Sequence, residues 1–289
     1  MGARVRAVDQ WVLGRVLGVQ EYFTLLGRAL RFSVTPPIYT RDVLVQMDRI
    51  GVGSLPPLLL VGLFTGMVIA LQTSVQLRLM GMESMLGNLV GASVVREAGP
   101  VLAALMVAGR VASGIAAELG AMRVTEQIDA LQTFGTDPIR KLVTPRILAA
   151  LVMLPIVTLI TVTIAIVGGL IVCVAKNVTP PGVYMQGVLG SLARKDFAFG
   201  WFPNILLMSI VKPLFFGLII ALTGCYYGLQ AVGGGEGVGR ATTKAMVLSF
   251  VLILVSDFFL TQLLLLLYNL IRYGAFRKFG DFGGGMSGT

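Results

Sequence analysis

The sequence contains no histidine and only two cysteines. The absence of histidine excludes imidazole metal sites, Ser-His-Asp triads and Cys-His dyads, and with them many hydrolytic enzymes. Cys173 and Cys225 lie inside apolar runs, which favours a small hydrophobic packing role over a disulfide or a metal site. We therefore expect no catalytic residue, metal site or cofactor in this chain.

Charged residues are also scarce: they make up 13% of the 289 residues, against roughly 25% in soluble domains. Hydrophobic residues make up 56%, and the mean hydropathy of +0.86 indicates an integral membrane protein. The net charge is +9, from 23 basic and 14 acidic residues. In so apolar a chain, this excess of basic residues favours contact with anionic lipid headgroups and control of membrane orientation over binding of nucleic acid.

Five stretches are long enough to cross a bilayer as helices, for which about 20 apolar residues are needed. Arg96 and Glu97 interrupt the second stretch, Lys212 lies in the fourth and Asp257 in the fifth. We predict an all-α membrane protein with spans at residues 50–77, 84–109, 147–175, 204–226 and 245–271.

The segment before the first span, residues 1–49, is not a signal peptide, because charges interrupt its apolar positions. Its apolar residues recur at spacings of four and three and form one stripe: Val12, Val16, Val19, Phe23, Leu26 and Leu30. The pattern predicts an N-terminal amphipathic interfacial helix, and a helix packed on the transmembrane bundle fits equally well. Residues 50–271 then form the five-span domain and residues 272–289 a C-terminal tail.

Basic residues beside the spans predict the orientation. With the N-terminus in the cytoplasm, fourteen of the 23 Lys and Arg residues lie inside and seven outside. The basic C-terminal tail argues mildly for the opposite orientation. We give more weight to the first helices and their flanks, which usually dominate topology.

Four ionisable residues inside predicted spans, Arg96, Glu97, Lys212 and Asp257, need a compensating environment. Each charge costs at least about 2.5 to 3.5 kcal/mol at the centre of a membrane helix. A wet cavity between helices would provide one, and it could also hold a polar headgroup. The alternative is that the four residues only bridge the helices.

The longest polar region between spans, residues 121–146, contains a predicted short cytoplasmic helix at residues 125–131. Its apolar positions have helical spacing: Val124, Ile128, Leu131 and Phe134. Glu126 and Asp129 form its polar surface. Such a helix can transmit force to a soluble motor, although a passive loop would have a similar composition.

The glycine-rich run GGGEGVGRATTK, residues 233–244, is not a phosphate-binding loop. It lacks the Gly-Lys-Ser/Thr ending of a Walker A motif and follows a membrane span instead of a strand. We predict a tight loop between helices. Since the chain has no ATP site, any ATP use requires another subunit.

Four sequence blocks resemble the MlaE permease family, the transmembrane subunits of ABC transporters associated with MCE proteins. They are REAGP (96–100), GRVASGIAAELGAMRVTEQIDAL (109–131), DPIRKLVTPR (137–146) and GGGEGVGRATT (233–243). The resemblance implies a homodimer in a bacterial inner membrane, bound to a cytoplasmic ATPase that uses ATP and Mg and to periplasmic MCE subunits. It implies lipids, mainly phospholipids, as substrates, and leaves the lipid species and the direction of transport open.

The resemblance also implies roles for individual residues. Arg96, Glu97, Lys212 and Asp257 match charged positions that line or close the lipid cavity. The short helix would be the coupling helix that docks on the ATPase, through Thr125, Glu126, Ile128, Asp129 and Leu131. Two other classes stay open: a proton-coupled carrier in which Glu97 or Asp257 titrates, and a structural membrane scaffold.

Overall fold

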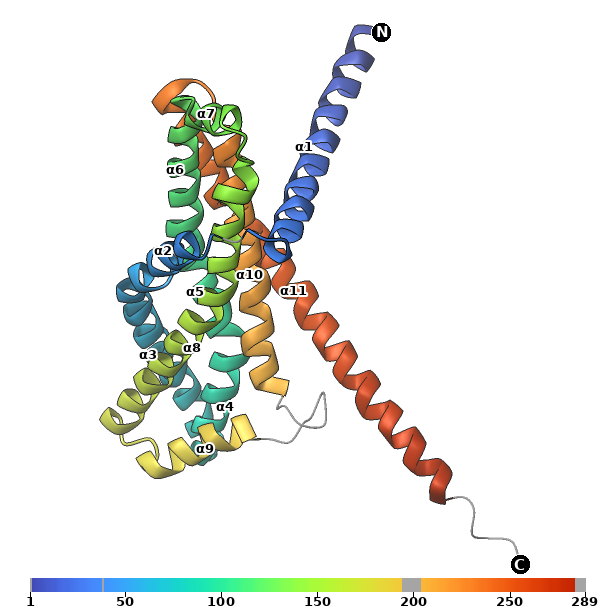
Figure 1. Cartoon of the computed structure of the whole chain (residues 1–289). Coiled ribbons are helices and arrows are strands. Elements are labelled where there is room, and N and C mark those ends of the chain that lie inside the picture. The colour runs from blue at the N-terminus through green and yellow to red at the C-terminus, as the bar shows by residue number, and fades with distance from the viewer. Residues whose placement is uncertain (1, 38, 194–203, 284–289) are drawn as a thin grey trace, which may run out of the picture. The chain divides into compact units, whose positions relative to one another are not determined.

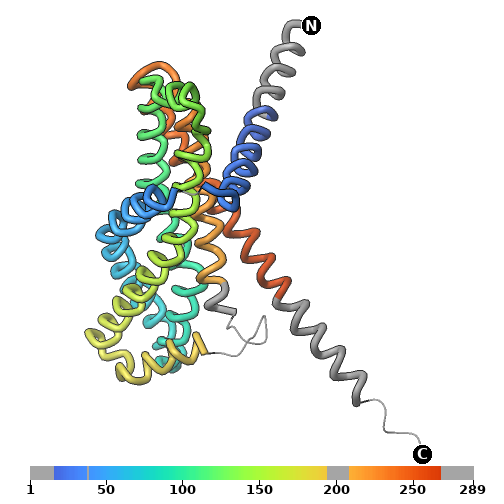
Figure 2. Tube along the Cα trace, viewed as in Figure 1, coloured from blue at the N-terminus to red at the C-terminus, as the bar shows by residue number. Residues whose placement is uncertain are grey.

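The computed structural model describes residues 2–37, 39–193 and 204–283 (Figure 1), and side chains within them for residues 16–37, 39–193 and 208–267 (Figure 2). All regular elements among the described residues are helices. Five of them are long and apolar enough to cross a membrane, which confirms the predicted fold class: Thr40–Leu79, Glu83–Val124, Ile139–Ala175, Met208–Leu229 and Gly234–Leu267. The chain is therefore a multi-pass membrane protein.

The first half of the chain contains two N-terminal helices and two spans. Its elements are α1 (Gly2–Val34), α2 (Thr40–Ile50), η1 (Val52–Ser54), α3 (Leu55–Leu79), η2 (Glu83–Met85), α4 (Leu86–Ser93), η3 (Val94–Ala98), α5 (Gly99–Val107), η4 (Ala108–Ala112) and α6 (Ser113–Val124). The elements from α4 to α6 form the second span, in which η3 and η4 are π-helical turns.

The second half begins with the predicted short helix between spans 2 and 3, which the structure shows as α7. Its elements are α7 (Gln127–Thr133), η5 (Ile139–Val143), α8 (Thr144–Ala175), α9 (Pro181–Ala193), α10 (Asn204–Leu229) and α11 (Gly234–Gly283). The last helix continues beyond the predicted end of the fifth span, and residues 284–289 of the predicted tail lie outside the described residues.

The glycine-rich run is not a loop over its whole length, which corrects the prediction for residues 233–244. The turn is confined to the residues before α11, which begins at Gly234. Gly233 and Gly234 have φ values of +93° and +69°, a region that glycine adopts without steric cost. At Gly237 a Cβ atom would overlap the carbonyl of Val232, so the tight start of this helix requires glycine.

Contacts divide the chain into two compact units. Unit 1 comprises Met1–Gly53, Val107–Met153 and Gly217–Phe250, and unit 2 comprises Ser54–Met106, Leu154–Phe216 and Val251–Thr289. Unit 1 therefore holds the N-terminal segment and the connections after spans 2 and 4, whereas unit 2 holds those after spans 1 and 3. Connections between successive spans alternate between the two sides of a membrane. The connections held by unit 1 therefore lie on one side, and those held by unit 2 lie on the other.

Glycine residues let the helices of unit 2 approach closely. A Cβ atom at Gly66 of α3 would overlap the carbonyl of Ala165 in α8, and one at Gly87 of α4 would overlap the backbone of Tyr184 in α9. Small residues at such contacts increase van der Waals packing, the main attraction between helices where no hydrophobic effect operates. These contacts surround a cluster of buried apolar side chains from α3, α4, η3, α8 and α9.

In unit 1, the second span carries a stripe of small residues spaced four apart, Ala112, Ala116 and Gly120, which packs against α10 and the turn after it. Cβ atoms at Gly224 and Gly228 would meet Ala112 and Ala116 of this stripe at 2.9–3.2 Å. The third member of the stripe, Gly120, faces Ala231. The stripe thus serves packing within the chain.

Helix α1 shows features of both predicted arrangements. One face packs on unit 1: Leu25 and Ala29 are buried, and the Tyr226 hydroxyl donates a hydrogen bond to the Gly18 carbonyl over 3.1 Å. The predicted stripe lies on the exposed side, where Val16, Val19, Phe23 and Leu30 are exposed and Leu26 is partly buried. The side chain of Val12 lies outside the described part. The exposed stripe remains available to a membrane interface.

Replacing Gly66 with alanine is expected to destabilise the protein by about 1–3 kcal/mol, because the new methyl group meets a helix backbone that cannot yield. Gly190 of α9 is the matched control, since a Cβ atom there meets nothing within 4 Å. Gly190→Ala should be neutral or stabilise by up to about 1 kcal/mol. Thermal unfolding of both purified variants in detergent measures the difference, and equal stabilities would contradict the packing account.

Candidate functional site

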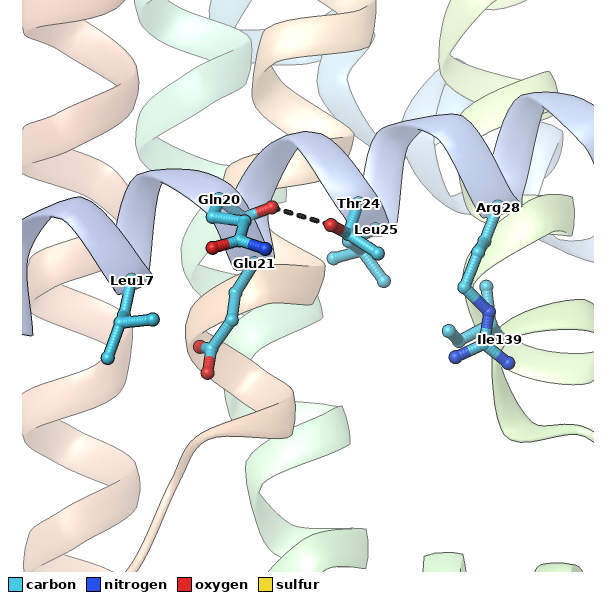
Figure 3. A pocket seen from close by; sticks show the side chains of 7 residues that line it. All are labelled: Leu17, Gln20, Glu21, Thr24, Leu25, Arg28 and Ile139. Atoms are coloured by element: carbon cyan, nitrogen blue, oxygen red, sulfur yellow. Dashed lines mark hydrogen bonds between the residues drawn. The ribbon is translucent and has the colours of Figure 1, made fainter.

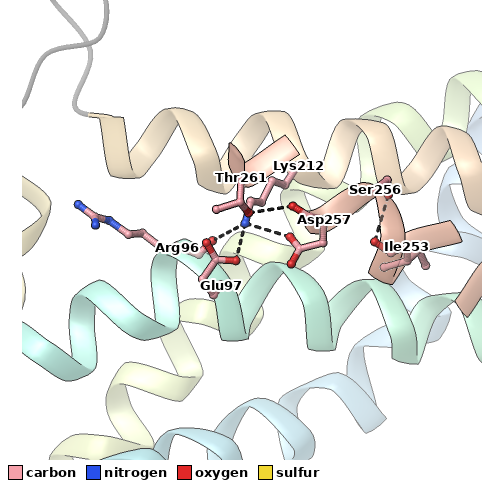
Figure 4. A network of polar contacts seen from close by, with 7 residues as sticks. All are labelled: Arg96, Glu97, Lys212, Ile253, Ser256, Asp257 and Thr261. Carbon is pink, nitrogen blue, oxygen red and sulfur yellow. Dashed lines mark hydrogen bonds and ion pairs between the residues drawn. The ribbon is translucent and has the colours of Figure 1, made fainter. Parts of the chain in front are cut away.

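Three charged side chains from three different spans meet inside unit 2 (Figure 4). The Lys212 side chain of α10 is 0% exposed, and its Nζ donates a hydrogen bond of 2.5 Å to Glu97 Oε2 of η3. The same Nζ lies 2.9 Å from Asp257 Oδ1 of α11. A buried ammonium group requires such partners, since an unpaired charge in an apolar interior is strongly destabilising.

Local sequence explains why η3 can receive Lys212. Pro100 has no N–H group and so cannot donate to the carbonyl of Arg96 in the α-helical pattern. The helix instead forms a π-helical turn at Val94–Ala98, and Lys212 Nζ donates to the Arg96 carbonyl over 3.3 Å. Such single π-turns occur frequently at functional sites. The REAGP block therefore supplies both a carboxylate and a free carbonyl to the same lysine.

The guanidinium group of Arg96 does not join this cluster. Figure 4 shows its side chain pointing away from Lys212, so only the backbone carbonyl takes part. No described residue pairs with this guanidinium, and the residue is partly exposed. Of the four predicted residues, the structure thus brings the side chains of three together and leaves the fourth side chain outside the cluster.

The cluster of Glu97, Lys212 and Asp257 has an excess of negative charge, with two carboxylates and one ammonium group. The Glu97 side chain is 45% exposed and accessible, whereas that of Asp257 is mostly buried. Asp257 Oδ1 lies 2.9 Å from Lys212 Nζ, so the same ammonium group is the partner of both carboxylates. The exposed part of the Glu97 carboxylate leaves the site open to water or to a polar group of a ligand.

Helix α7 and the bend before it hold the residues predicted to couple to an ATPase, and the helix itself lies two residues later than the predicted range 125–131. Ile128 is buried and fixes the helix to its own unit, and Asp129 forms an ion pair with Arg123 of α6. Glu126 has a left-handed φ of +59° and makes the bend between α6 and α7, directly after Thr125. Leu131 is partly buried. The contacts of these residues therefore fix the position of α7 within unit 1.

Phe134 was predicted to continue the apolar face of this short helix, and that prediction is wrong. Its side chain is 84% exposed, because α7 ends at Thr133. The end is a Schellman motif: the Gly135 N–H donates to the Gln132 carbonyl and the Thr136 N–H to the Leu131 carbonyl. The helical spacing does not extend to Phe134, since the chain turns there.

The DPIRK segment after α7 holds the N-terminal helices, a role that the sequence reasoning missed. Asp137 forms an ion pair of 2.8 Å with Arg28 of α1, and Lys141 forms one of 2.5 Å with Asp42 of α2. Arg140 donates to the carbonyl of Thr35 over 2.9 Å. The adjacent opposite charges in this segment were the available signal, but their partners lie about 100 residues away in the sequence.

A second missed network lies within unit 1. Glu118 of α6 contacts Arg49 of α2 at 2.9 Å and Arg146 of α8 at 3.0 Å. Arg146 is buried, and it also donates to the carbonyl of Leu142 over 2.6 Å. The signal was an acidic residue within the small-residue stretch of span 2. The network joins an N-terminal helix to two spans.

A groove of about 360 Å³ runs along α1 in unit 1 (Figure 3). It is lined by Leu17, Gln20, Glu21, Thr24, Leu25, Arg28 and Ile139. Its two charged residues have partners already: Glu21 accepts from Gln230 over 2.7 Å and Arg28 pairs with Asp137. Nearby, burial raises the pKa of the Tyr22 phenol above its ordinary value. The groove thus offers little unpaired charge to a ligand.

Comparison with known proteins establishes the family. The pattern of the family described as Permease MlaE matches residues 43–263. A probable ABC transporter permease protein of Rickettsia conorii is 42% identical over 235 residues, which cover 81% of this chain and 87% of the relative. A probable ABC transporter permease protein of Synechocystis is 38% identical over 242 residues, covering 84% and 89%.

These matches define an ABC transporter permease, and the chain belongs to the MlaE permease family. A chloroplast relative from Arabidopsis thaliana, Protein TRIGALACTOSYLDIACYLGLYCEROL 1, is 34% identical over 238 residues, which cover 82% of this chain and 65% of the relative. Permeases of this type lack ATPase activity and work with a separate ATPase. Among the residues searched, no group of three or more Cys, Asp or Glu side chains could hold a metal ion.

Lys212→Met is expected to destabilise the protein by up to about 3 kcal/mol, because it leaves two carboxylates without a cation. The expected loss of stability is smaller than that for a fully buried ion pair, because the Glu97 side chain is partly exposed. Adding Glu97→Gln and Asp257→Asn to the same protein removes both unpaired charges and should restore most of the stability. Unfolding in detergent distinguishes the two variants, and equal losses in both would refute charge pairing as the cause.

Proposed function

We propose that the chain is the transmembrane subunit of an MCE-associated ABC transporter that moves lipids, in particular phospholipids. ATP and Mg are bound by the separate ATPase subunit, and a periplasmic MCE protein exchanges lipid with the permease. The observation that carries the proposal is the charged site inside the spans of a family member. It combines the buried Lys212 and its two carboxylates with the adjacent Arg96, whose guanidinium has no partner among the described residues.

The geometry supports different roles for the two cations. Lys212 is fully buried and already has three oxygen partners, so it positions Glu97 and Asp257. Arg96 is partly exposed and has no partner among the described residues. A guanidinium group binds phosphate through two parallel hydrogen bonds. We therefore assign headgroup contact to Arg96, and to Glu97 the negative charge that keeps this contact weak enough for release.

The comparisons support a lipid as substrate. The Arabidopsis relative carries the name of a glycolipid, trigalactosyldiacylglycerol. Its 34% identity extends over 82% of this chain. Lipid transport also suits a site where charged groups lie within apolar spans, since a lipid brings a polar headgroup and apolar tails together.

The proposed assembly is a homodimer in a bacterial inner membrane, with the N-terminus in the cytoplasm. The N-terminal segment (1–49) lies at the interface, the five-span domain (50–271) carries lipid, and α7 couples it to the ATPase. The grouping of residues 1–53 with the connections after spans 2 and 4 supports placing these parts on one side of the membrane. The excess of basic residues in the same parts supports the cytoplasmic side.

One observation favours a second candidate, a proton-coupled carrier. Glu97 and Asp257 lie within two spans and share a single lysine, so the cluster holds one more carboxylate than ammonium groups. Against it stand the relatives named ABC transporter permeases at about 40% identity. Coupling to ATP therefore remains the better supported mechanism.

Reconstitution into vesicles with the ATPase and the MCE subunit tests the proposal. ATP should drive transfer of phospholipid, and a pH gradient alone should not. Arg96→Gln should reduce transfer at least about tenfold, the loss expected of one charge-assisted phosphate contact, without lowering the melting temperature. Glu97→Lys should impair both transfer and stability, because it places a second cation beside Lys212.

Two results would contradict the proposal. Transfer at the unmodified rate by the Arg96→Gln and Lys212→Ala variants would show that the charges only bridge helices. Transfer that follows a pH gradient without ATP would identify the proton-coupled carrier instead. Bound lipids from the native complex, identified by mass spectrometry, would add the lipid species.

Cysteine labelling tests the orientation, because the two native cysteines are buried and give little background. Met80 follows the first span, and Gln132 lies between the second and third spans; both are exposed. In intact cells, an impermeant maleimide should label Met80→Cys and leave Gln132→Cys unlabelled until the membrane is permeabilised. The reverse pattern would place the N-terminus outside.

A further inference from the structure

Two large apolar side chains are exposed in the connections that follow the second and fourth spans of unit 1. Phe134 follows α7 and is 84% exposed, and Val232 lies in the turn between α10 and α11 and is 72% exposed. The candidate spans end at Val124 and Leu229 and resume at Ile139 and Gly234. The bilayer core that covers exposed apolar residues of the spans therefore does not cover these two.

Both side chains lie on the same side of the membrane. One follows the second span and the other the fourth, so two crossings separate them. Both belong to unit 1, and Gly120 near the end of α6 faces Ala231, the neighbour of Val232. Figure 1 draws α7 and the turn before α11 at the same end of α6.

Rigid backbone geometry fixes both positions. Phe134 is held by the Schellman motif, in which Gly135 has a φ of +74° and its N–H donates to the Gln132 carbonyl over 2.9 Å. Val232 is followed by Gly233 and Gly234, both with positive φ, and its carbonyl contacts Gly237 closely. An apolar side chain presented on an ordered backbone loses little entropy on binding, which is typical of interface anchors.

We propose that Phe134 and Val232 are the apolar anchors through which this permease docks on its cytoplasmic ATPase. The inference rests on the proposed function, which places α7 at the ATPase. Within that region, it assigns the main contact to Phe134 and Val232. Ile128 is buried in its own unit and Asp129 is paired with Arg123, so these predicted coupling residues are occupied within the chain. The ATPase would supply apolar pockets for a phenyl ring and a branched side chain.

Charges around the two anchors are largely balanced. Asp129 pairs with Arg123 beside α7, and Glu236 pairs with Arg240 over 2.6 Å at the start of α11. A contact with an apolar centre and internally paired charges should depend little on salt, because screening weakens only exposed charge attraction. The salt dependence of the affinity therefore distinguishes docking through Phe134 and Val232 from docking through the acidic face of α7, formed by Glu126 and Asp129.

Titration of the purified ATPase onto the full-length permease in nanodiscs tests the inference. Phe134→Ala should weaken the affinity at least about tenfold, as expected of an aromatic anchor. Val232→Ala removes less surface and should weaken it about threefold or more. Val34→Ala is the matched control, since Val34 is 82% exposed on α1 and should leave the affinity unchanged. All three side chains are exposed, so melting temperatures should not fall.

Raising the salt concentration from 50 to 500 mM should change the affinity of the unmodified protein less than about threefold. Unchanged affinity in both Phe134→Ala and Val232→Ala would overturn the inference. So would an affinity that falls steeply with salt and is lost in Glu126→Gln but kept in Phe134→Ala, which would assign docking to the acidic face. Failure of the unmodified permease to bind any ATPase would instead overturn the proposed function.

Discussion

The cost of placing charge inside a membrane governs the arrangement of unit 2. Lys212 is fully buried, and it is tolerated because oxygen atoms from two other spans surround its ammonium group. Asp257 depends on this lysine most, since its side chain is mostly buried, whereas that of Glu97 is partly exposed. One lysine thus requires that α10, α11 and η3 meet at the same depth, and this meeting point is where the site forms.

Departures from ideal α-helical geometry place the charged residues of the spans. The three π-helical turns η3, η4 and η5 each contain basic residues: Arg96, Arg110, and Arg140 with Lys141. A π-turn leaves part of the backbone hydrogen-bond ladder unfilled and shifts the side chains that follow. At η3 the consequence is direct, because Lys212 uses the carbonyl that Pro100 cannot satisfy. The π-helical turn η3 is therefore part of both the second span and the charged site.

The sequence predicted what depends on composition and local spacing. Span number and approximate position follow from hydropathy, and the association of Glu97, Lys212 and Asp257 follows from the cost of burying each alone. Features set by long-range partners were missed, such as the pairing of Asp137 with Arg28 across 109 positions. The direction of the Arg96 side chain was also unpredictable, since it depends on a π-turn that hydropathy does not reveal.

The contacts that escaped sequence reasoning connect the α7 end of unit 1 to its N-terminal helices. Asp137 follows the exposed Phe134 by only three positions, and the segment that starts there holds α1 through Arg28 and α2 through Asp42. A displacement of the end of α7 would therefore pull on charged contacts before it reached the apolar interior. Because α1 exposes its apolar stripe, movement of this helix would change how the chain meets the membrane surface. The same short segment thus joins the proposed ATPase surface to the helix that exposes the apolar stripe.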